Sequence, residues 1–435
     1  MIRHWFTDIP AFQRDPLGLL AARGREASAP LVPLALGPRS VVLVVDPHLI
    51  KPILRASEDA IDKGALVRKL RKVLGLSSLT MGGEAHQGRR EVLHQQLSRG
   101  MAQNYVPEMC ATIRQIAIRT VLQGEFAAAD LASQLALKLI CIALFGRQVL
   151  SDEDEVALVR SVKEIEGDLQ RSMFRVLPPS PWQMLKQSRL HRDAREQMAG
   201  IVDRVAARAR GTSVLSALSS LQLTLGELRD ELLTMLIAGY HTTASAAAWL
   251  FYCLATHPFI AEQIADEARR VVDTSGEIKP SSLPKASTSL SFVREVLRLY
   301  PPAWWMSREV KQDFIVAGRN LRRGTTLIIC PWQLHRDPRN FDAPEAFSIE
   351  RSFAVPAYVP FGSGPRACVG MGVALLELQL MTLELASAFE FHAIRQTMPP
   401  KVSAGVILSP PNVMLSMHVR QPRFRTRKVA MAFHG

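Results

Sequence analysis

The chain has 435 residues, of which 48% are apolar, and carries a formal net charge of +13 at pH 7. This composition provides enough apolar side chains for a large packed core. No run of eighteen uninterrupted apolar residues occurs, and the start, MIRHWFTDIPAFQRDP, is charged, so we expect a cytoplasmic protein with no integral membrane association and no secretory signal.

The basic residues are dispersed along the chain, with one cluster at 420–428 (RQPRFRTRK). Net positive charge suits nucleic acid, an anionic membrane or an acidic protein partner. No nucleic-acid motif is visible and few aromatic residues are interleaved with the charge. We therefore expect no nucleic-acid partner and favour an acidic protein.

The five cysteines do not have the spacing of a disulfide framework or a zinc site. Cys141, Cys253 and Cys330 lie in apolar runs, where cysteine behaves as a small hydrophobic residue. Cys368 differs, because it stands between glycines and two residues after an arginine.

The pattern along the chain is mainly helical. The expected elements are, in chain order, two short strands within 31–45, helices over most of 48–275 with a proline-rich break at 176–182, a small sheet within 314–330, a structured loop at 334–347, and a helix from near Cys368 to about 390. We expect one mainly α domain over residues 1–435, with a small antiparallel sheet assembled from both ends of the chain and a basic tail at about 421–435.

The longest predicted helix covers residues 225–256. Thr224 and Glu227 form a capping-box pattern at its start, and His257 before Pro258 ends it. At 1.5 Å per residue such a helix is roughly 48 Å long. It must cross the whole molecule.

The centre of this helix contains a polar group of residues, AGYHTT. Thr242 follows Ala238 by four residues, so its hydroxyl can bond the Ala238 carbonyl and loosen the helix, and Gly239 helps a local widening. Small residues at 238 and 239 also let a flat ligand approach. A threonine- and alanine-rich core helix is the other interpretation.

The segment around Cys368 is suited to holding a thiolate. Gly362, Gly364 and Gly370 permit sharp turns, while backbone N–H groups and a helix N-terminus stabilise a sulfur anion. Arg366 can grip a carboxylate through two hydrogen bonds. These parts fit an axial metal ligand, although a glycine-rich turn with a structural cysteine remains possible.

Two further pairs lie at helical spacing. His86 and Arg90 are four residues apart and Glu295 and Arg298 three apart, so each pair shares a helix face. By themselves these patterns also describe a solvated basic helix and an exposed ion pair of little energetic value.

The stretch FGSGPRACVG (361–370) resembles, position for position, the F-G-x-G-x-R-x-C-x-G haem-binding signature of the cytochrome P450 family, and Ala374 and Glu377 continue it. The resemblance covers about residues 5–420 and implies the P450 fold, with the long central helix over a haem b. It implies these contacts to the haem: Cys368 as the axial ligand of the iron, Phe361 as the aromatic that shields the sulfur, Arg366 as a propionate partner, and Gly370 beside the cysteine.

Other segments resemble further motifs of the family, and they occur along the chain in the same order as in the family. GEAHQGRREVL contains H-x-x-x-R, which implies that His86 and Arg90 bind a haem propionate, with Arg308 completing that clamp. REVLRLYPP resembles the E-x-x-R helix, whose Glu295 and Arg298 would join Arg351 in a buried triad. His335 matches a loop motif, or only packs there.

AGYHTT resembles the oxygen-binding motif A-G-x-[D/E]-T-T, which brings Ala238 and Gly239 beside the haem and makes Thr242 the catalytic threonine. His241 departs from the motif, because the family usually has an acid there. Imidazole, with an ordinary pKa of about 6.5, can also relay protons, and some members such as sterol demethylases carry histidine here. We expect Thr242 and His241 to be the catalytic residues for proton transfer.

The function implied is a haem-thiolate monooxygenase that uses two electrons and O2 to place one oxygen atom in an apolar C–H bond and forms water. No flavin or nicotinamide domain is recognised, so the electrons would come from a separate acidic ferredoxin or flavodoxin. The expected substrate is terpenoid or fatty-acid-like, and the protein a monomer. Alternatives are a peroxide-driven or isomerising haem-thiolate enzyme and a non-catalytic binder of haem or an apolar ligand.

The expected pocket walls are the helix face of Ala238, Thr242 and Ala246, the segment 302–306 (PAWWM) and the segment 406–411 (VILSPP). The two tryptophans of PAWWM are equally consistent with core packing and with substrate contact.

Overall fold

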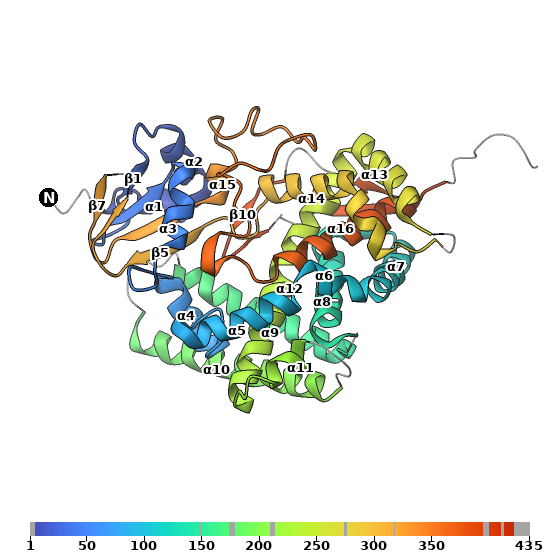
Figure 1. Cartoon of the computed structure of the whole chain (residues 1–435), viewed down its shortest axis with the longest axis horizontal. Helices are drawn as coiled ribbons and strands as arrows, with labels where there is room; N and C mark the ends of the chain where they lie inside the picture. The colour runs from blue at the N-terminus through green and yellow to red at the C-terminus, as the bar shows by residue number, and fades with distance from the viewer. Residues whose placement is uncertain are drawn as a thin grey trace, which may run out of the picture.

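The computed structural model describes residues 5–147, 149–173, 179–208, 214–273, 276–316, 318–394, 400–409 and 413–421. Helices form most of the molecule, and a sheet of N-terminal and later strands lies at one side of them (Figure 1). The predicted basic tail is outside the described residues except for Gln421, as are residues 176–178 of the proline-rich break.

The chain up to the central helix is largely helical, as predicted. Its helices are α1 (Ile9–Arg14), α2 (Pro16–Arg25), α3 (Ile50–Arg55), α4 (Ala65–Leu74), α5 (Gly83–Gln96), α6 (Arg99–Ala102), α7 (Val106–Gln123), α8 (Ala128–Phe145), α9 (Asp152–Met173), α10 (Pro181–Arg208) and α11 (Val214–Ser219). The remaining helices are α12 (Leu225–Thr256), α13 (Pro258–Val271), α14 (Ser287–Leu299), α15 (Pro331–Leu334) and α16 (Met371–Ala388).

The strands are short. They are β1 (Leu31–Leu34), β2 (Val41–Val44), β3 (Ile61–Asp62), β4 (Glu125–Ala127), β5 (Met306–Val310), β6 (Phe314–Val316), β7 (Arg319–Leu321), β8 (Thr326–Ile329), β9 (Phe389–Ala393), β10 (Ser403–Ala404), β11 (Leu408–Ser409) and β12 (Met414–Val419). A single-turn 3₁₀ helix, η5 (Gly364–Arg366), precedes Cys368.

The largest sheet has the order β1-β2-β8-β5-β3, so it draws strands from both ends of the chain, as predicted. β1 and β2 are antiparallel, but β2 and β8 are parallel, with Val41 opposite Thr326. The sheet is therefore mixed, where the sequence analysis expected an antiparallel one. A parallel pair needs a crossover connection, and the long helical part of the chain between β2 and β8 provides it.

The central helix α12 begins and ends at the predicted residues. Glu227 N–H donates to the Thr224 hydroxyl at 3.2 Å, and Thr224 N–H donates to the Glu227 carboxylate at 3.1 Å, which completes the capping box. The helix ends before His257, and α13 starts at Pro258 after a bend of 106°. α12 packs most extensively against α8, and also contacts α16 and α10. It runs through the molecule beneath the other helices (Figure 1).

Two helices among the described residues, α8 and α16, are long and apolar enough to cross a membrane by length and composition alone, and α12 with α13 would count as a third if the bent pair were one span. In the fold, 72% of the α8 segment and 67% of the α16 segment are buried. Both helices contact α12 and contribute to the same main core, so packing inside the protein accounts for their apolar composition.

Candidate active site

The Cys368 loop makes a close turn against α3. Gly364 has a φ of 72°, and a Cβ at this position would lie 2.5 Å from the Leu54 carbonyl oxygen. Only glycine satisfies both the positive φ and this approach. Cys368 N–H donates to the Phe361 carbonyl at 2.8 Å, which closes the turn and leaves the cysteine just before Met371, the first residue of α16.

Cys368 is the exposed cysteine of this chain, whereas the other four, all within described residues, are buried. Protein atoms nevertheless surround its thiol, and this burial raises the pKa of Cys368. The Gly370 N–H, which donates to the sulfur, and the positive charge of Arg90 oppose that rise. Cys368 therefore has the N–H donor and the nearby cation that stabilise a thiolate.

Part of the polar centre of α12 is accessible as well. Ala238 is exposed and Thr242 partly exposed, although most neighbouring residues of this helix are buried. The Thr242 hydroxyl donates to the Ala238 carbonyl at 2.8 Å, as predicted. The expected local widening is not found, because α12 is a continuous α-helix through this bond.

The bare side of Gly239 lies against a neighbouring helix. A Cβ at this position would lie 2.6 Å from Cδ1 and 2.7 Å from Cγ1 of Ile140 in α8. The side of Gly239 that lacks a side chain is thus filled by Ile140, and its small size serves the packing of α12 on α8.

Helix α16 joins the cysteine loop to α12. Glu377 of α16 is buried and hydrogen-bonded to Thr243, the residue after Thr242. Burial raises the pKa of Glu377 to about 8. The sequence analysis placed Glu377 in the signature without assigning this contact, which depends on how the two helices cross.

The residues expected to bind propionates lie on three elements: His86 and Arg90 on α5, Arg308 on β5 and Arg366 in η5. Arg90 donates to the Ala367 carbonyl at 2.6 Å, which places it beside the cysteine. His86 is buried, so the solvated-helix interpretation is wrong for this residue.

These cations affect one another. Burial, with the charges of Arg366 and Lys63, lowers the pKa of His86 to about 4, and burial with the charge of Arg366 lowers the pKa of Arg308 to about 10. Burial also lowers the pKa of Arg366. Positive charge is therefore concentrated in a poorly solvated place.

Two members of this cluster were missed in the sequence. Lys63, whose pKa is lowered to about 7 by burial and then by Arg366 and Arg308, donates to the carbonyls of Ser78 and Leu79. Glu58 pairs with Arg366 and accepts from Gly83 N–H at 2.8 Å. Neither residue lies in a recognisable motif, and both reach the cluster only through the tertiary fold.

This arrangement fits a haem. His86 Nδ1 is a buried polar atom without a hydrogen-bond partner, and its closest carboxylate oxygen, on Glu58, is 3.9 Å away. The buried cations here outnumber the carboxylates around them. The two propionate groups of a haem would therefore be stabilised at this place. A cysteine sulfur is a suitable axial donor for haem iron.

His241 is paired across the fold. Its Nε2 lies 3.0 Å from an Oε2 atom of Glu166 in α9, and both side chains are partly exposed. The sequence analysis did not identify Glu166, which is one of several acidic residues on an amphipathic helix and carries no signal of its own.

The three predicted pocket walls come together. Leu408 N–H donates to the Pro302 carbonyl at 3.0 Å, and the Ser245 hydroxyl donates to the Leu408 carbonyl. Trp304 is fully buried and donates through Nε1 to the Gly405 carbonyl at 2.9 Å. Trp304 is thus a core residue, whereas Trp305 is only partly buried, so the open alternative is decided for Trp304 alone.

The E-x-x-R pair is buried, not exposed. Arg298 Nε and Nη2 donate to the two Glu295 oxygens at 2.7 and 2.8 Å, and Arg351 donates to Glu295 at 3.2 Å. Arg298 also donates to the carbonyl of His335 at 2.8 Å. The triad therefore holds the segment that leads to the cysteine loop.

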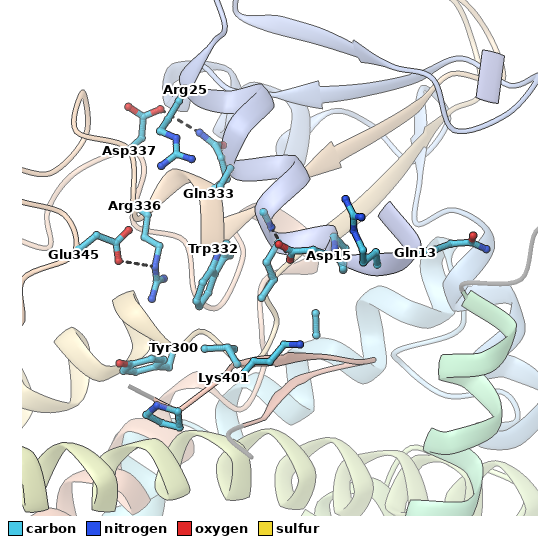
Figure 2. Close-up of a pocket in the computed structure, with 18 of the residues that line it drawn as sticks. Gln13, Asp15, Arg25, Tyr300, Trp332, Gln333, Arg336, Asp337, Glu345 and Lys401 are labelled. Carbon is cyan, nitrogen blue, oxygen red and sulfur yellow. Dashed lines mark hydrogen bonds and ion pairs between the residues drawn. The ribbon is translucent and has the colours of Figure 1, made fainter. Parts of the chain in front are cut away.

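A cavity of about 930 Å³ lies elsewhere, between α1 and α2, the α15 segment and the residues around Lys401 (Figure 2). Figure 2 shows Tyr300, Trp332 and Lys401 around it, with Arg336 paired to Glu345. None of its described lining residues is a predicted site residue. Cavity size alone therefore does not identify the reaction site.

Comparisons with known proteins show the family to which this chain belongs. The family model "Cytochrome P450" matches residues 13–417. Cyclooctat-9-en-7-ol 5-monooxygenase of Streptomyces melanosporofaciens is 27% identical over 413 residues, which are 89% of this chain and 87% of that protein. Cytochrome P450 4V2 of Homo sapiens is 26% identical over 430 residues, 88% of this chain and 81% of that one.

Solved structures share the fold. The cytochrome P450DA heme domain superposes with a TM-score of 0.83 at 21% identity, covering 95% of each chain. CYP175A1 from Thermus thermophillus gives a TM-score of 0.78 at 24% identity, covering 97% of this chain and 99% of that one.

The helix-rich fold, the haem-binding signature around Cys368 and the family match together define a haem-thiolate enzyme. The chain belongs to the cytochrome P450 family and is a cytochrome P450 monooxygenase.

Proposed function

We propose that this monooxygenase hydroxylates a terpenoid or fatty-acid-like substrate and takes its electrons from a separate acidic ferredoxin or flavodoxin. The observation that carries the proposal is Cys368, an exposed cysteine whose sulfur receives the Gly370 N–H, in a chain whose polar α12 centre is also partly accessible. We further propose a cytoplasmic monomer that binds haem b.

Four side chains would hold the cofactor besides Cys368. His86, Arg90, Arg308 and Arg366 would bind its carboxylates, and the Arg366–Glu58 pair would be part of that site. Haem held by Cys368 supplies the reductive activation of O2 and the insertion of one oxygen atom into a C–H bond.

The protein's own contribution on α12 is proton transfer. Thr242 holds its hydroxyl proton toward the Ala238 carbonyl and can redirect it, while the neighbouring His241 can take a proton from solvent. The exposed Ala238 leaves room for small reactants beside this hydroxyl.

The substrate proposal is supported by the apolar walls. Ala246, Ile407 and Leu408 are buried and apolar, and the segments that carry them are joined by the Ser245 and Leu408 hydrogen bonds. A relative that is 27% identical is named for the oxygenation of an alcohol, cyclooctat-9-en-7-ol. An apolar molecule of this general kind suits such walls.

The first test is spectroscopic. We expect the reduced carbon monoxide complex of the wild type to show the red-shifted Soret band of a thiolate ligand and Cys368→Ser to lose it, because a serine oxygen is a weaker donor. Cys330→Ser, at a buried cysteine, is the control and should keep the band. An unchanged band in Cys368→Ser would exclude Cys368 as the ligand.

The second test is a substrate-induced spin-shift screen of the purified protein with terpenoids and fatty acids. A shift to high spin followed by hydroxylated product in the presence of a ferredoxin, its reductase and NADPH supports the proposal. Shifts given only by polar compounds would contradict the substrate class. Thr242→Ala should divert electrons to peroxide, and if His241→Ala keeps the wild-type yield of product per electron, the histidine is a packing residue.

A further inference from the structure

We infer that the cavity of Figure 2 is a second binding site, separate from the haem site, and that it takes a small organic carboxylate with an apolar body. The inference does not depend on the proposed substrate or electron donor. It rests on a buried cation with an unsatisfied nitrogen, on an excess of positive charge around the cavity and on apolar lining residues.

Arg336 in the cavity wall faces two aromatic rings. Its Cζ atom lies 3.4 Å from the centroid of the Trp332 ring and 5.8 Å from that of the Tyr300 ring. Figure 2 shows the guanidinium beside Trp332 and above Tyr300. A planar guanidinium stacked in this way has little freedom to turn. Its hydrogen-bond donors are therefore oriented before a ligand arrives.

The charge of Arg336 is poorly compensated. Its side chain is 9% exposed, and its Nε lies 3.3 Å from a carboxylate oxygen of Glu345, a side chain that is 71% exposed, so water weakens this ion pair. Burial lowers the pKa of Arg336 to about 10, against the opposing charge of Glu345, and the guanidinium stays positive at pH 7. Among the described residues, its buried Nη1 has no hydrogen-bond partner. An anion in the cavity would stabilise this cation.

A second unsatisfied polar atom belongs to the same wall. Gln333 Oε1 is buried with no hydrogen-bond partner in the described part of the chain, although Nε2 of this residue donates to Asp337 at 3.1 Å. The described residues contain seven such buried side-chain atoms, and two of them are on residues that line this cavity. Because unsatisfied polar atoms are rare inside proteins, two on one cavity wall indicate a polar ligand.

Positive charge exceeds negative charge around the cavity. The described lining residues include four cations and three carboxylates, namely Arg14, Arg25, Arg336 and Lys401, and Asp15, Asp337 and Glu345. Two of the carboxylates have other partners, since Asp337 accepts from Arg339 Nε at 2.8 Å and Asp15 accepts from Gly18 N–H at 2.9 Å. The cations other than Arg336 are exposed, so they add positive charge at the edge of the cavity. Both the edge and the buried wall therefore favour an anion.

The remaining lining suits an apolar body. Leu17, Ala21 and Val402 are among the residues around the cavity, whose volume is about 930 Å³. Pockets of roughly 300–1,000 Å³ hold small organic ligands. The ligand then has an acidic end near Arg336 and an apolar part against these side chains.

Packed residues separate the cavity from the centre of α12. The Tyr300 ring stacks on Trp249 of α12 with 3.7 Å between the ring centroids, about two helical turns beyond Thr242. Ala404 of β10 lines the cavity, and Leu408 of the paired strand β11 accepts from Ser245 of α12. A ligand in this cavity is therefore distinct from a substrate beside Thr242.

Packing alone is the competing explanation. In that case Arg336 only joins α14 to α15 through Tyr300 and Trp332, and the cavity has no affinity for carboxylates. The two explanations differ in a binding measurement that needs no turnover.

The test is isothermal titration calorimetry of the haem-loaded enzyme with 4-phenylbutyrate and 2-naphthoate. The iron is first saturated with 4-phenylimidazole, so that the haem site is occupied. The matching amides, 4-phenylbutanamide and 2-naphthamide, keep the apolar body but carry no charge. We expect at least one carboxylate to bind one to one with a Kd of about 1 mM or lower, and its amide to bind about 10-fold more weakly.

Two variants place this binding in the cavity. Arg336→Met keeps an apolar chain between the rings but removes the charge and the N–H groups, and it should weaken carboxylate binding about 10-fold. The double variant Arg25→Gln/Lys401→Gln changes only exposed residues and should weaken it about 2- to 3-fold. Neither should alter the carbon monoxide spectrum.

The matched control is the double variant Arg119→Gln/Lys186→Gln. These residues are exposed on α7 and α10, lie outside the cavity lining, and carry the same charge as the exposed pair. The control should bind the carboxylate as the wild type does, because general attraction of anions to a basic protein is lowered equally in both double variants.

The inference is overturned if neither carboxylate binds, if the amides bind as tightly as the acids, or if binding occurs only without 4-phenylimidazole. Equal weakening in the two double variants would also overturn it. If Arg336→Met does not fold, the amides and the two double variants still decide the question. None of these outcomes bears on the proposed substrate or electron donor.

Discussion

At the residue scale, Gly239 shows how a motif position can serve packing. The motif comparison predicts a small residue that admits a flat ligand, and the structure places Ile140 of α8 against its bare side. A glycine in a helix interior costs about 1 kcal/mol relative to alanine. The close approach of α8 and α12 requires it nonetheless.

We therefore predict that Gly239→Ala destabilises the protein by about 1–2 kcal/mol, because the added Cβ would lie 2.6 Å from Ile140 Cδ1 and the overpacking exceeds the gain in helix propensity. In an Ile140→Ala background the same change should be neutral or stabilising. Chemical unfolding of the four proteins measures the coupling. Equal effects of Gly239→Ala in both backgrounds would contradict the packing role.

At the scale of elements, α14 and the chain after it are joined by buried polar contacts. His335 Nδ1–H donates to the Arg298 carbonyl at 3.0 Å, and Val359 N–H donates to His335 Nε2 at 3.1 Å. The ring thus needs one nitrogen protonated and the other bare, which is the neutral form. Burial lowers the pKa of His335 to about 3.

This contact predicts a loss of stability in acid. The pKa of histidine is about 6.5 in the unfolded chain and lower in the folded one, so the contribution of neutral His335 is complete above pH 6.5 and falls as the pH decreases toward 3. The slope is about 1.4 kcal/mol per pH unit, or about 2 kcal/mol between pH 7 and 5.

Urea unfolding at pH 7 and pH 5 measures this effect. His335→Gln keeps a donor and an acceptor but does not titrate, so its stability should depend less on pH than that of the wild type. The same acid dependence in both proteins would assign the effect to other groups.

At the scale of the whole molecule, the net charge of +13 bears on the electron donor. An acidic carrier is attracted to a basic protein. Salt weakens this attraction, because the Debye length is about 10 Å at 0.1 M ionic strength and more distant charges are screened. The proposal of a ferredoxin or flavodoxin therefore has an electrostatic consequence.

With the carrier at limiting concentration, we predict that O2-supported turnover falls several-fold when ionic strength rises from about 0.05 to about 0.3 M. Peroxide-supported turnover needs no carrier and should change little, which makes it the control. Turnover independent of salt would contradict an electrostatically guided donor.

Features formed by residues that lie close together in the sequence could be predicted from the sequence. The Cys368 loop, the Thr242–Ala238 bond and the capping box at Thr224 each depend on residues a few positions apart, and their geometry follows from the turn or helix that contains them. For the same reason the ends of α12 matched the expected ones.

Contacts between segments were decided by the tertiary structure. The pairing of His241 with Glu166, and the proximity of Lys63 and Glu58 to Arg366, join residues of different elements. The spacing of residues along the chain does not specify how two helices cross or which loop covers them. The packing of the elements therefore determines whether a charged residue is solvated or buried in a site.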